Sequence, residues 1–60
     1  MSYVLKNEQG LYYGGYADSA PILYRTKREE TKFDDEVADK VLKQLTDLGF
    51  TGWKKERINE

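Results

Sequence analysis

The chain has 60 residues, of which ten are basic and eleven acidic, and its formal net charge at pH 7 is −1. It contains no histidine and no cysteine, which excludes disulfides, thiol nucleophiles, histidine bases and the usual ligands of zinc. The balanced charge also removes the general electrostatic argument for a protein that binds nucleic acid or a membrane.

Two strands joined by a tight turn are predicted near the N-terminus, over Tyr3–Lys6 and Leu11–Tyr16. The sequence Asn7-Glu8-Gln9-Gly10 between them fits a type I turn in which Gly10 takes the left-handed position of a three-residue hairpin loop. Gly14-Gly15 interrupts the second strand. Such a pair usually marks a bulge, a bend or a close approach of another backbone.

The small and polar run from Ala17 to Pro21 is predicted as a loop, and Ile22–Lys27 as a third strand. The charged residues Arg28–Thr31 are expected to form a turn or to extend this strand. Near the other end of the chain, Thr51–Ile58 is predicted as a last strand. Its alternation is imperfect, because Trp53 and Ile58 fall on opposite faces unless a bulge intervenes.

The clearest predicted element is an amphipathic helix over Asp35–Leu48. Apolar residues recur along it at steps of three and four, and these are Val37, Ala38, Val41, Leu42, Leu45 and Leu48. We expect Asp34 to cap the first turn through its carboxylate. At the other end, Gly49 is expected to take a left-handed conformation, with Phe50 contacting Leu45 in a Schellman ending.

These elements predict an α+β fold, a small antiparallel sheet of three to four strands with one helix on one face, in the order β-β-β-α-β. We expect a single domain over residues 1–60. One helix covers only one face of a sheet, yet the second strand places Tyr13 on one face and Tyr12 and Tyr16 on the other. A twin subunit, another protein or a folded-back terminus would cover the second face, unless the tyrosines simply tolerate exposure.

Self-association is expected for a further reason, which is the size of the domain. A chain of this length buries only about 60% of the surface that its unfolded form exposes, and it has no crosslink to compensate. No apolar run has the length of a signal peptide or approaches the ~20 residues of a membrane span. We therefore expect a cytoplasmic protein with no membrane partner.

Few residues are arranged for catalysis or for metal binding. No hydroxyl group stands in a G-x-S-x-G context, and the glycines do not have the spacing of a phosphate loop. Asp35 and Asp39 lie one helical turn apart and would reach a common hard cation, although acidic residues are also favoured in a first helical turn for their effect on the helix dipole. We expect no enzyme activity, no metal site and no cofactor.

Single-stranded nucleic acid is the alternative ligand, because rings interleaved with cations hold single strands by stacking and by phosphate contacts. The rings would be those of Tyr12, Tyr13, Tyr16 and Trp53, and the cations Lys27, Arg28, Lys32, Lys54, Lys55 and Arg57. Interspersed glutamates dilute this positive charge, and the isoelectric point is about 5.4. Lysines that deter pairing between sheet edges explain the same residues.

Several segments together carry a resemblance to a known group of proteins. They are Tyr3-Val4-Leu5-Lys6-Asn7 leading to Gly10 and Tyr12-Tyr13, Phe33-Asp34 with the helix that follows, and Gly49-Phe50 with Trp53. This pattern resembles small accessory proteins of phages and prophages of Gram-positive bacteria. The resemblance implies an accessory role in the host-cell cytoplasm, and some phage proteins of this size block host defence by binding a host protein, often as homodimers.

The function expected from the sequence is non-enzymatic protein binding, most concretely by a phage accessory or anti-defence protein that inhibits a host protein. A homodimer is the expected assembly. We expect aromatic residues to make the contacts, because aromatic anchors dominate interface energetics. The candidates are Tyr12, Tyr13, Tyr16, Tyr24 and Trp53, of which at least one is expected to lie in the core instead.

Overall fold

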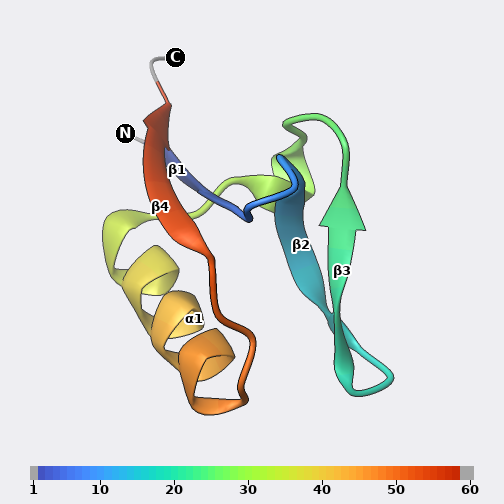
Figure 1. Cartoon of the computed structure of the whole chain (residues 1–60). Helices are drawn as coiled ribbons and strands as arrows, with labels where there is room; N and C mark the ends of the chain where they lie inside the picture. Colours follow the sequence, from blue (N-terminus) through green and yellow to red (C-terminus); the bar gives the residue numbers. More distant parts are fainter. Residues whose placement is uncertain (1, 59–60) are drawn as a thin grey trace.

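The computed structural model describes residues 2–58, which form one antiparallel sheet and one long helix (Figure 1). The strands are β1 (Ser2–Lys6), β2 (Tyr12–Ala17), β3 (Ala20–Tyr24) and β4 (Lys54–Ile58), and their order across the sheet is β3-β2-β1-β4. A 3-10 helix, η1 (Glu29–Thr31), and the helix α1 (Asp35–Asp47) lie between β3 and β4 in sequence. The predicted α+β fold class and order of elements are confirmed.

Helix α1 ends as the sequence predicts. Gly49 has a φ of +92°, its N–H donates to the carbonyl of Thr46 at 3.0 Å, and the N–H of Phe50 donates to the carbonyl of Leu45 at 2.8 Å. This pair of bonds is the Schellman ending. At the start of the helix Asp34 is the N-cap residue, but the carboxylate cap is wrong: its side chain makes no capping hydrogen bond within the described chain.

The turn between β1 and β2 is also confirmed. Gly10 has a φ of +82°, and its N–H donates to the carbonyl of Asn7 at 3.1 Å. The side-chain oxygen of Asn7 accepts hydrogen bonds from the N–H groups of Gln9 and Leu11, both at 2.9 Å. Asn7 therefore fixes the turn with its own side chain, as asparagine often does at the first position of a turn.

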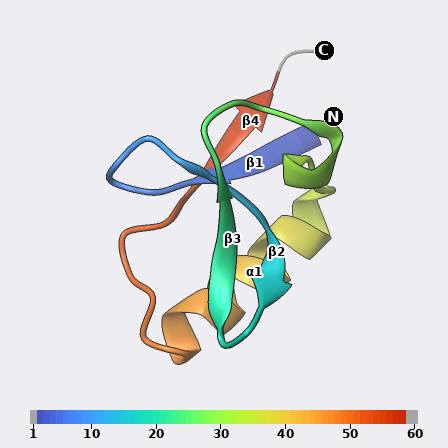
Figure 2. The same ribbon diagram turned by 90° about the vertical axis from the view of Figure 1, so that its right-hand side faces the viewer.

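The second hairpin is tighter than predicted. Asp18 and Ser19 alone connect β2 to β3, and both have positive φ, of 52° and 64°, as a two-residue type I′ turn requires. The predicted loop over Ala17–Pro21 is therefore wrong, because Ala17 ends β2 and Pro21 lies within β3. Proline is tolerated there because β3 is an edge strand (Figure 2), which leaves one side of the backbone without a ladder partner.

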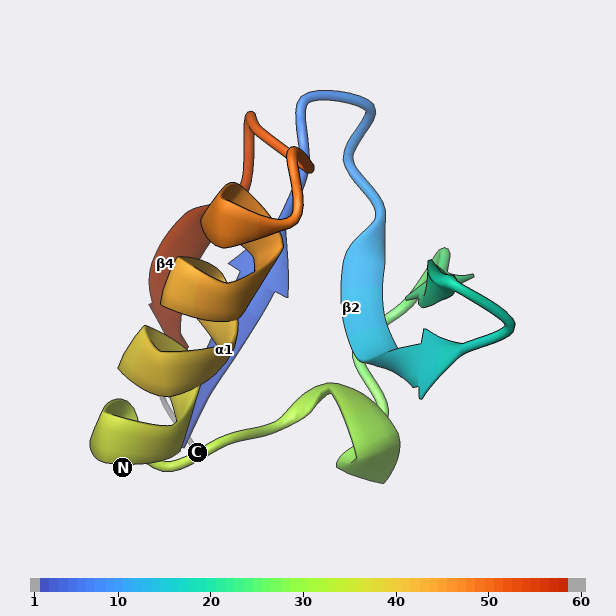
Figure 3. The same ribbon diagram turned by 90° about the horizontal axis from the view of Figure 1, so that it is seen from below.

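Strands β1 and β2 diverge soon after the turn that joins them. β1 pairs with β4 along its whole length, but its register with β2 consists of the single pair Lys6↔Tyr12. Farther along the same edge, Tyr3 exchanges two backbone hydrogen bonds of 2.8 Å with Phe33. The β2–β3 hairpin consequently stands apart from the unit formed by β1, β4 and α1 (Figure 3).

A small apolar core joins these two parts. Its buried members are Leu5, Tyr13, Ala38 and Leu45. The ring of Tyr13 lies 5.8 Å from that of Phe33 and 6.0 Å from that of Trp53, the latter in an edge-to-face arrangement. Since β1 and β2 share so little backbone pairing, the packing of Tyr13 holds the hairpin to the rest of the molecule.

One charged contact fastens α1 to β4. The ammonium of Lys55 donates hydrogen bonds to the carboxylates of Asp35 and Asp39, the latter at 2.8 Å, and lies 4.9 Å from the ring centre of Tyr3. The hydrogen bond to Asp35, followed by that to Asp39, raises the pKa of Lys55 above its ordinary value of 10.5. The two aspartates considered for a cation therefore bind a lysine of the same chain.

We expect Lys55→Gln to lower the melting temperature measured by circular dichroism, because it removes the charge that links α1 to β4. The pKa of Lys55 is raised by folding, so its contribution is complete below pH 10.5 and disappears as the pH rises through the folded-state value. The difference between wild type and variant should thus narrow at alkaline pH and in high salt.

The matched control for Lys55 is its neighbour Lys54, which points to the opposite face and has no ion pair within residues 2–58. Lys54→Gln removes the same charge and should leave the melting temperature unchanged. If the melting temperature falls equally in the two variants, the contact of Lys55 with Asp35 and Asp39 makes no specific contribution to stability.

Any side chain at Gly14 would collide with the ring of Tyr24. A Cβ atom built there would lie 1.9 Å from Cε2 of Tyr24, so Gly14→Ala should lower the free energy of unfolding by about 1–3 kcal/mol, the usual cost of overpacking. In a Tyr24→Leu background the cost should shrink, since the ring is gone. Urea unfolding measures this cost in both backgrounds. If Gly14→Ala lowers the free energy of unfolding equally in the two, the loss arises from the backbone and not from the ring of Tyr24.

Candidate functional site

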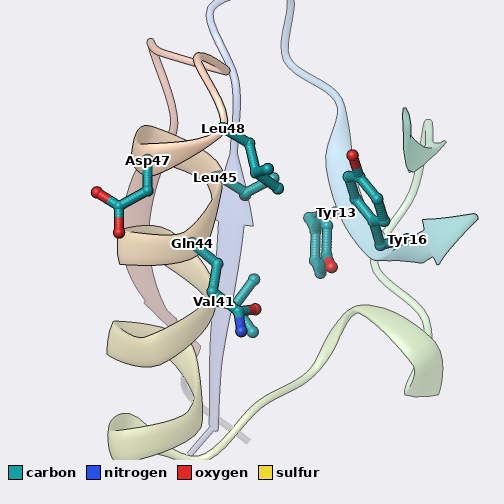
Figure 4. A pocket seen from close by; sticks show the side chains of 7 residues that line it. All are labelled: Tyr13, Tyr16, Val41, Gln44, Leu45, Asp47 and Leu48. Atoms are coloured by element: carbon teal, nitrogen blue, oxygen red, sulfur yellow. The ribbon is translucent and has the colours of Figure 1, made fainter. Parts of the chain in front are cut away.

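A groove between α1 and β2 is the strongest candidate for a binding site. It has a volume of about 410 Å³ and lies where the hairpin separates from the helix (Figures 3 and 4). Its lining residues come from β2, from α1 and from the residue that follows α1. They are Tyr13, Tyr16, Val41, Gln44, Leu45, Asp47 and Leu48. We call this site the α1–β2 groove.

The β2 wall of the groove depends on the bulge at the two glycines. Tyr13 pairs with Leu23, whereas Tyr16 pairs with Pro21, so β2 carries one extra residue between these positions. In a regular strand Tyr13 and Tyr16 would point to opposite faces. The bulge cancels this alternation, and both rings line the same groove (Figure 4).

The α1 wall follows the apolar stripe of the helix. Val41, Leu45 and Leu48 succeed one another at steps of four and three, and Leu45 and Leu48 are directed toward the two tyrosines (Figure 4). Leu45 is buried and forms part of the core, whereas Leu48 is 58% exposed. Asp47 points away from the tyrosines in the same view, so the walls that face each other are largely apolar.

The two tyrosines differ in their environments. Tyr13 is buried, and Tyr16 is 43% exposed with its ring 6.2 Å from that of Phe50. Burial raises the pKa of Tyr13 above its ordinary value of 10.0, and the nearby Tyr16 raises it further. Tyr13 therefore forms a fixed neutral floor, while Tyr16 and Leu48 form an accessible rim.

The structure divides the five aromatic residues predicted to make contacts. Tyr13 is buried in the core, and the half-buried Trp53 packs against it without lining the groove. Tyr12 and Tyr24 form a cross-strand pair on the other face of the hairpin. Of the five, only Tyr13 and Tyr16 come together in the α1–β2 groove.

Sequence reasoning missed the helical side of the groove. Leu48 belongs to the periodic stripe of α1, so the pattern assigns it to the core together with Leu45 and Val41. The structure places Leu48 one residue beyond α1, at the C-cap, and leaves it exposed. The separation of β1 from β2, which leaves Leu48 exposed, has no signature in the local sequence.

Other kinds of site find little support in the part of the chain that the structure describes. No group of three or more aspartates and glutamates is placed to hold a metal ion among residues 2–58. The buried hydroxyl of Thr31 bonds the backbone of Arg28, accepting from its N–H and donating to its carbonyl, both at 2.8 Å. Within the same residues, no helix has the length and apolar character needed to cross a membrane.

The chain matches no protein-family model, no curated protein and no solved structure. The interpretation of the groove consequently rests on its own geometry.

We expect one tyrosine to ionise later than the others in an absorbance titration, because burial disfavours the charged phenolate. Tyr13→Phe should remove this late phase. Tyr16→Phe should keep it and move it to slightly lower pH, since the neighbouring negative charge is lost. A late phase that persists in Tyr13→Phe would show that another ring is the most shielded one.

Proposed function

We propose that this chain is a non-enzymatic protein-binding module and that its α1–β2 groove receives an apolar segment of a partner protein. The observation that carries this proposal is the exposed rim of Tyr16 and Leu48 above the buried floor of Tyr13 and Leu45. Exposed apolar groups around a preformed depression are typical of protein interaction sites.

The composition of the groove favours a protein segment over a small polar ligand. Sites for small molecules combine apolar walls with several convergent polar groups that fix the orientation of the ligand. Here the uncharged polar groups of the lining are the Gln44 amide and the two tyrosine hydroxyls, and the carboxylate of Asp47 is directed away from the tyrosines (Figure 4). Such a surface selects by shape and burial, as a groove for the apolar face of a helix or strand does.

The rigidity of the floor also supports binding. Tyr13 is held by the rings of Phe33 and Trp53, and Leu45 is fixed by the core around it. A partner would therefore order few new side chains, chiefly Tyr16 and Leu48, which keeps the side-chain part of the entropic cost of association small.

Two more specific versions follow from the sequence. In one, a second copy of the chain fills the groove and the protein is a homodimer. In the other, the partner is a host protein that a phage accessory or anti-defence protein inhibits by occupying its surface, and the cytoplasm is where this would happen. The resemblance to small phage and prophage proteins is the support for the second version.

The test uses two variants of the rim, Tyr16→Ser and Leu48→Ser. Sedimentation velocity on the wild type first decides whether the chain self-associates. If it is monomeric, a partner captured from bacterial lysate is identified by mass, purified and titrated by calorimetry. Each rim variant should weaken the measured association by about 2 kcal/mol or more, roughly thirty-fold.

Val37→Ser is the matched control, because Val37 is also 43% exposed on α1 but does not line the groove. It should leave association unchanged, and circular dichroism should show that all three variants are folded. If the rim variants bind as tightly as Val37→Ser and the wild type, the groove is not the binding site.

A further inference from the structure

We propose a second binding surface, for single-stranded nucleic acid, on the sheet face opposite α1. The register of the strands places four residues side by side across the whole sheet: Lys54 pairs with Lys6, Lys6 with Tyr12, and Tyr12 with Tyr24. Directly paired residues of antiparallel strands point to the same face. We call these four residues the cross-strand row.

The neighbouring residues identify the face on which this row lies. Leu5 packs in the core with Ala38 and Leu45 of α1, and Lys55 binds Asp35 and Asp39 of the same helix. Successive residues of a strand alternate between the two faces. Lys6 and Lys54 therefore point away from α1, and so do their partners in the row.

Cations surround the two rings of the row. The ammonium of Lys6 lies 5.9 Å from the ring centre of Tyr12, and that of Lys27 lies 6.0 Å from it. The guanidinium of Arg28 lies 5.4 Å from the ring centre of Tyr24. Among residues 2–58, no carboxylate forms an ion pair with any of these three cations.

These contacts fit the requirements for binding single-stranded nucleic acid. The row spans about 14 Å, three strand spacings of about 4.8 Å, which is room for two or three nucleotides. Two adjacent tyrosine rings offer surfaces on which successive bases stack. Within residues 2–58 no carboxylate forms an ion pair with Lys6, Lys27 or Arg28, so these cations can turn to phosphates. Cation–π contacts at exposed sites are weak, so Lys6, Lys27 and Arg28 lose little when they turn from a ring to a phosphate.

Gly14 contributes to the shape of this surface. Its missing side chain leaves the space that the Tyr24 ring occupies, since a Cβ at that position would lie 1.9 Å from the ring. The ring is thereby held close to the backbone of β2 beside Tyr12. An acidic peptide would satisfy the cations equally well but has no general use for two adjacent rings, and for this reason we favour a nucleic acid.

The arrangement differs from the one expected from the sequence. Tyr13 is buried in the core with the half-buried Trp53 packed against it, Tyr16 lines the α1–β2 groove, and Lys55 is bound to α1. Of the expected rings the surface keeps only Tyr12, to which Tyr24 is added, and it lies on the opposite side of the sheet from the groove. It is independent of the protein-binding function, so Leu48→Ser should leave it intact.

The test is fluorescence anisotropy with a labelled oligothymidylate. The wild type should bind at about 20 mM salt and weaken as salt rises, because single-strand binding releases counterions. Lys27→Gln combined with Arg28→Gln should bind more weakly and reduce the slope of log K against log salt by about 1.4, for two lost phosphate contacts. Tyr12→Leu should bind about five-fold more weakly or worse, with the slope unchanged, because only stacking is lost.

The matched control is Lys40→Gln combined with Lys43→Gln, two exposed lysines of α1 that lie away from the row. It removes the same charge and should leave binding unchanged. A second measurement needs no variant. When oligothymidylate is added to the wild type, the amide resonances of Tyr12 and Tyr24 should shift in the nuclear magnetic resonance spectrum, and that of Leu48 should not.

Three results would overturn the proposal. They are no binding at low salt, an equal loss in the α1 control, and unchanged binding by a folded Tyr12→Leu variant. The last result, together with competition by an oligoglutamate peptide, would identify a surface for acidic protein segments instead.

Discussion

The packing of Tyr13 between the two halves of the sheet is the interaction on which the rest of the structure depends. β1 and β2 share one residue pair, because the backbone of Phe33 occupies the edge of β1 beside Tyr3. With so little ladder pairing, the hairpin is positioned chiefly by the ring of Tyr13 against Phe33 and Trp53. In a chain with few fully buried side chains, one aromatic contact of this kind contributes a large share of the core.

Because β2 separates from β1, both faces of the β2–β3 hairpin offer surface for binding. On the side toward α1, the gap above Tyr13 becomes the apolar groove, with Tyr16 and Leu48 at its rim. On the other side, Tyr12 and Tyr24 lie among cations that have no carboxylate partner in the described chain. The two faces of the hairpin therefore differ in character, one apolar and one cationic with exposed edges of rings, and for this reason we propose a different class of partner for each.

Individual elements show how far sequence reasoning reaches. The helix, its Schellman ending and the Asn7–Gly10 turn are confirmed because local hydrogen bonds and conformational preferences decide them. Pro21 misled the prediction, since proline is typical of loops but is also accommodated on an edge strand. Whether β3 is an edge strand depends on the order of strands, which short-range patterns do not encode. The bulge at Gly14-Gly15 was anticipated as one option, yet its effect on the directions of Tyr13 and Tyr16 became visible only with the register.

The sequence by itself determined the fold class, the order of elements and the excess of apolar and aromatic residues over what one helix covers, because these follow from periodicity and composition. Tertiary structure alone decided which rings are buried and which are accessible, since that depends on contacts between residues distant in the chain. Lys6 and Tyr24 stand in one row only because of the strand register, and Tyr16 meets Leu48 only because β2 leaves β1. Such long-range geometry arises from the packing of the whole chain, and no single segment specifies it.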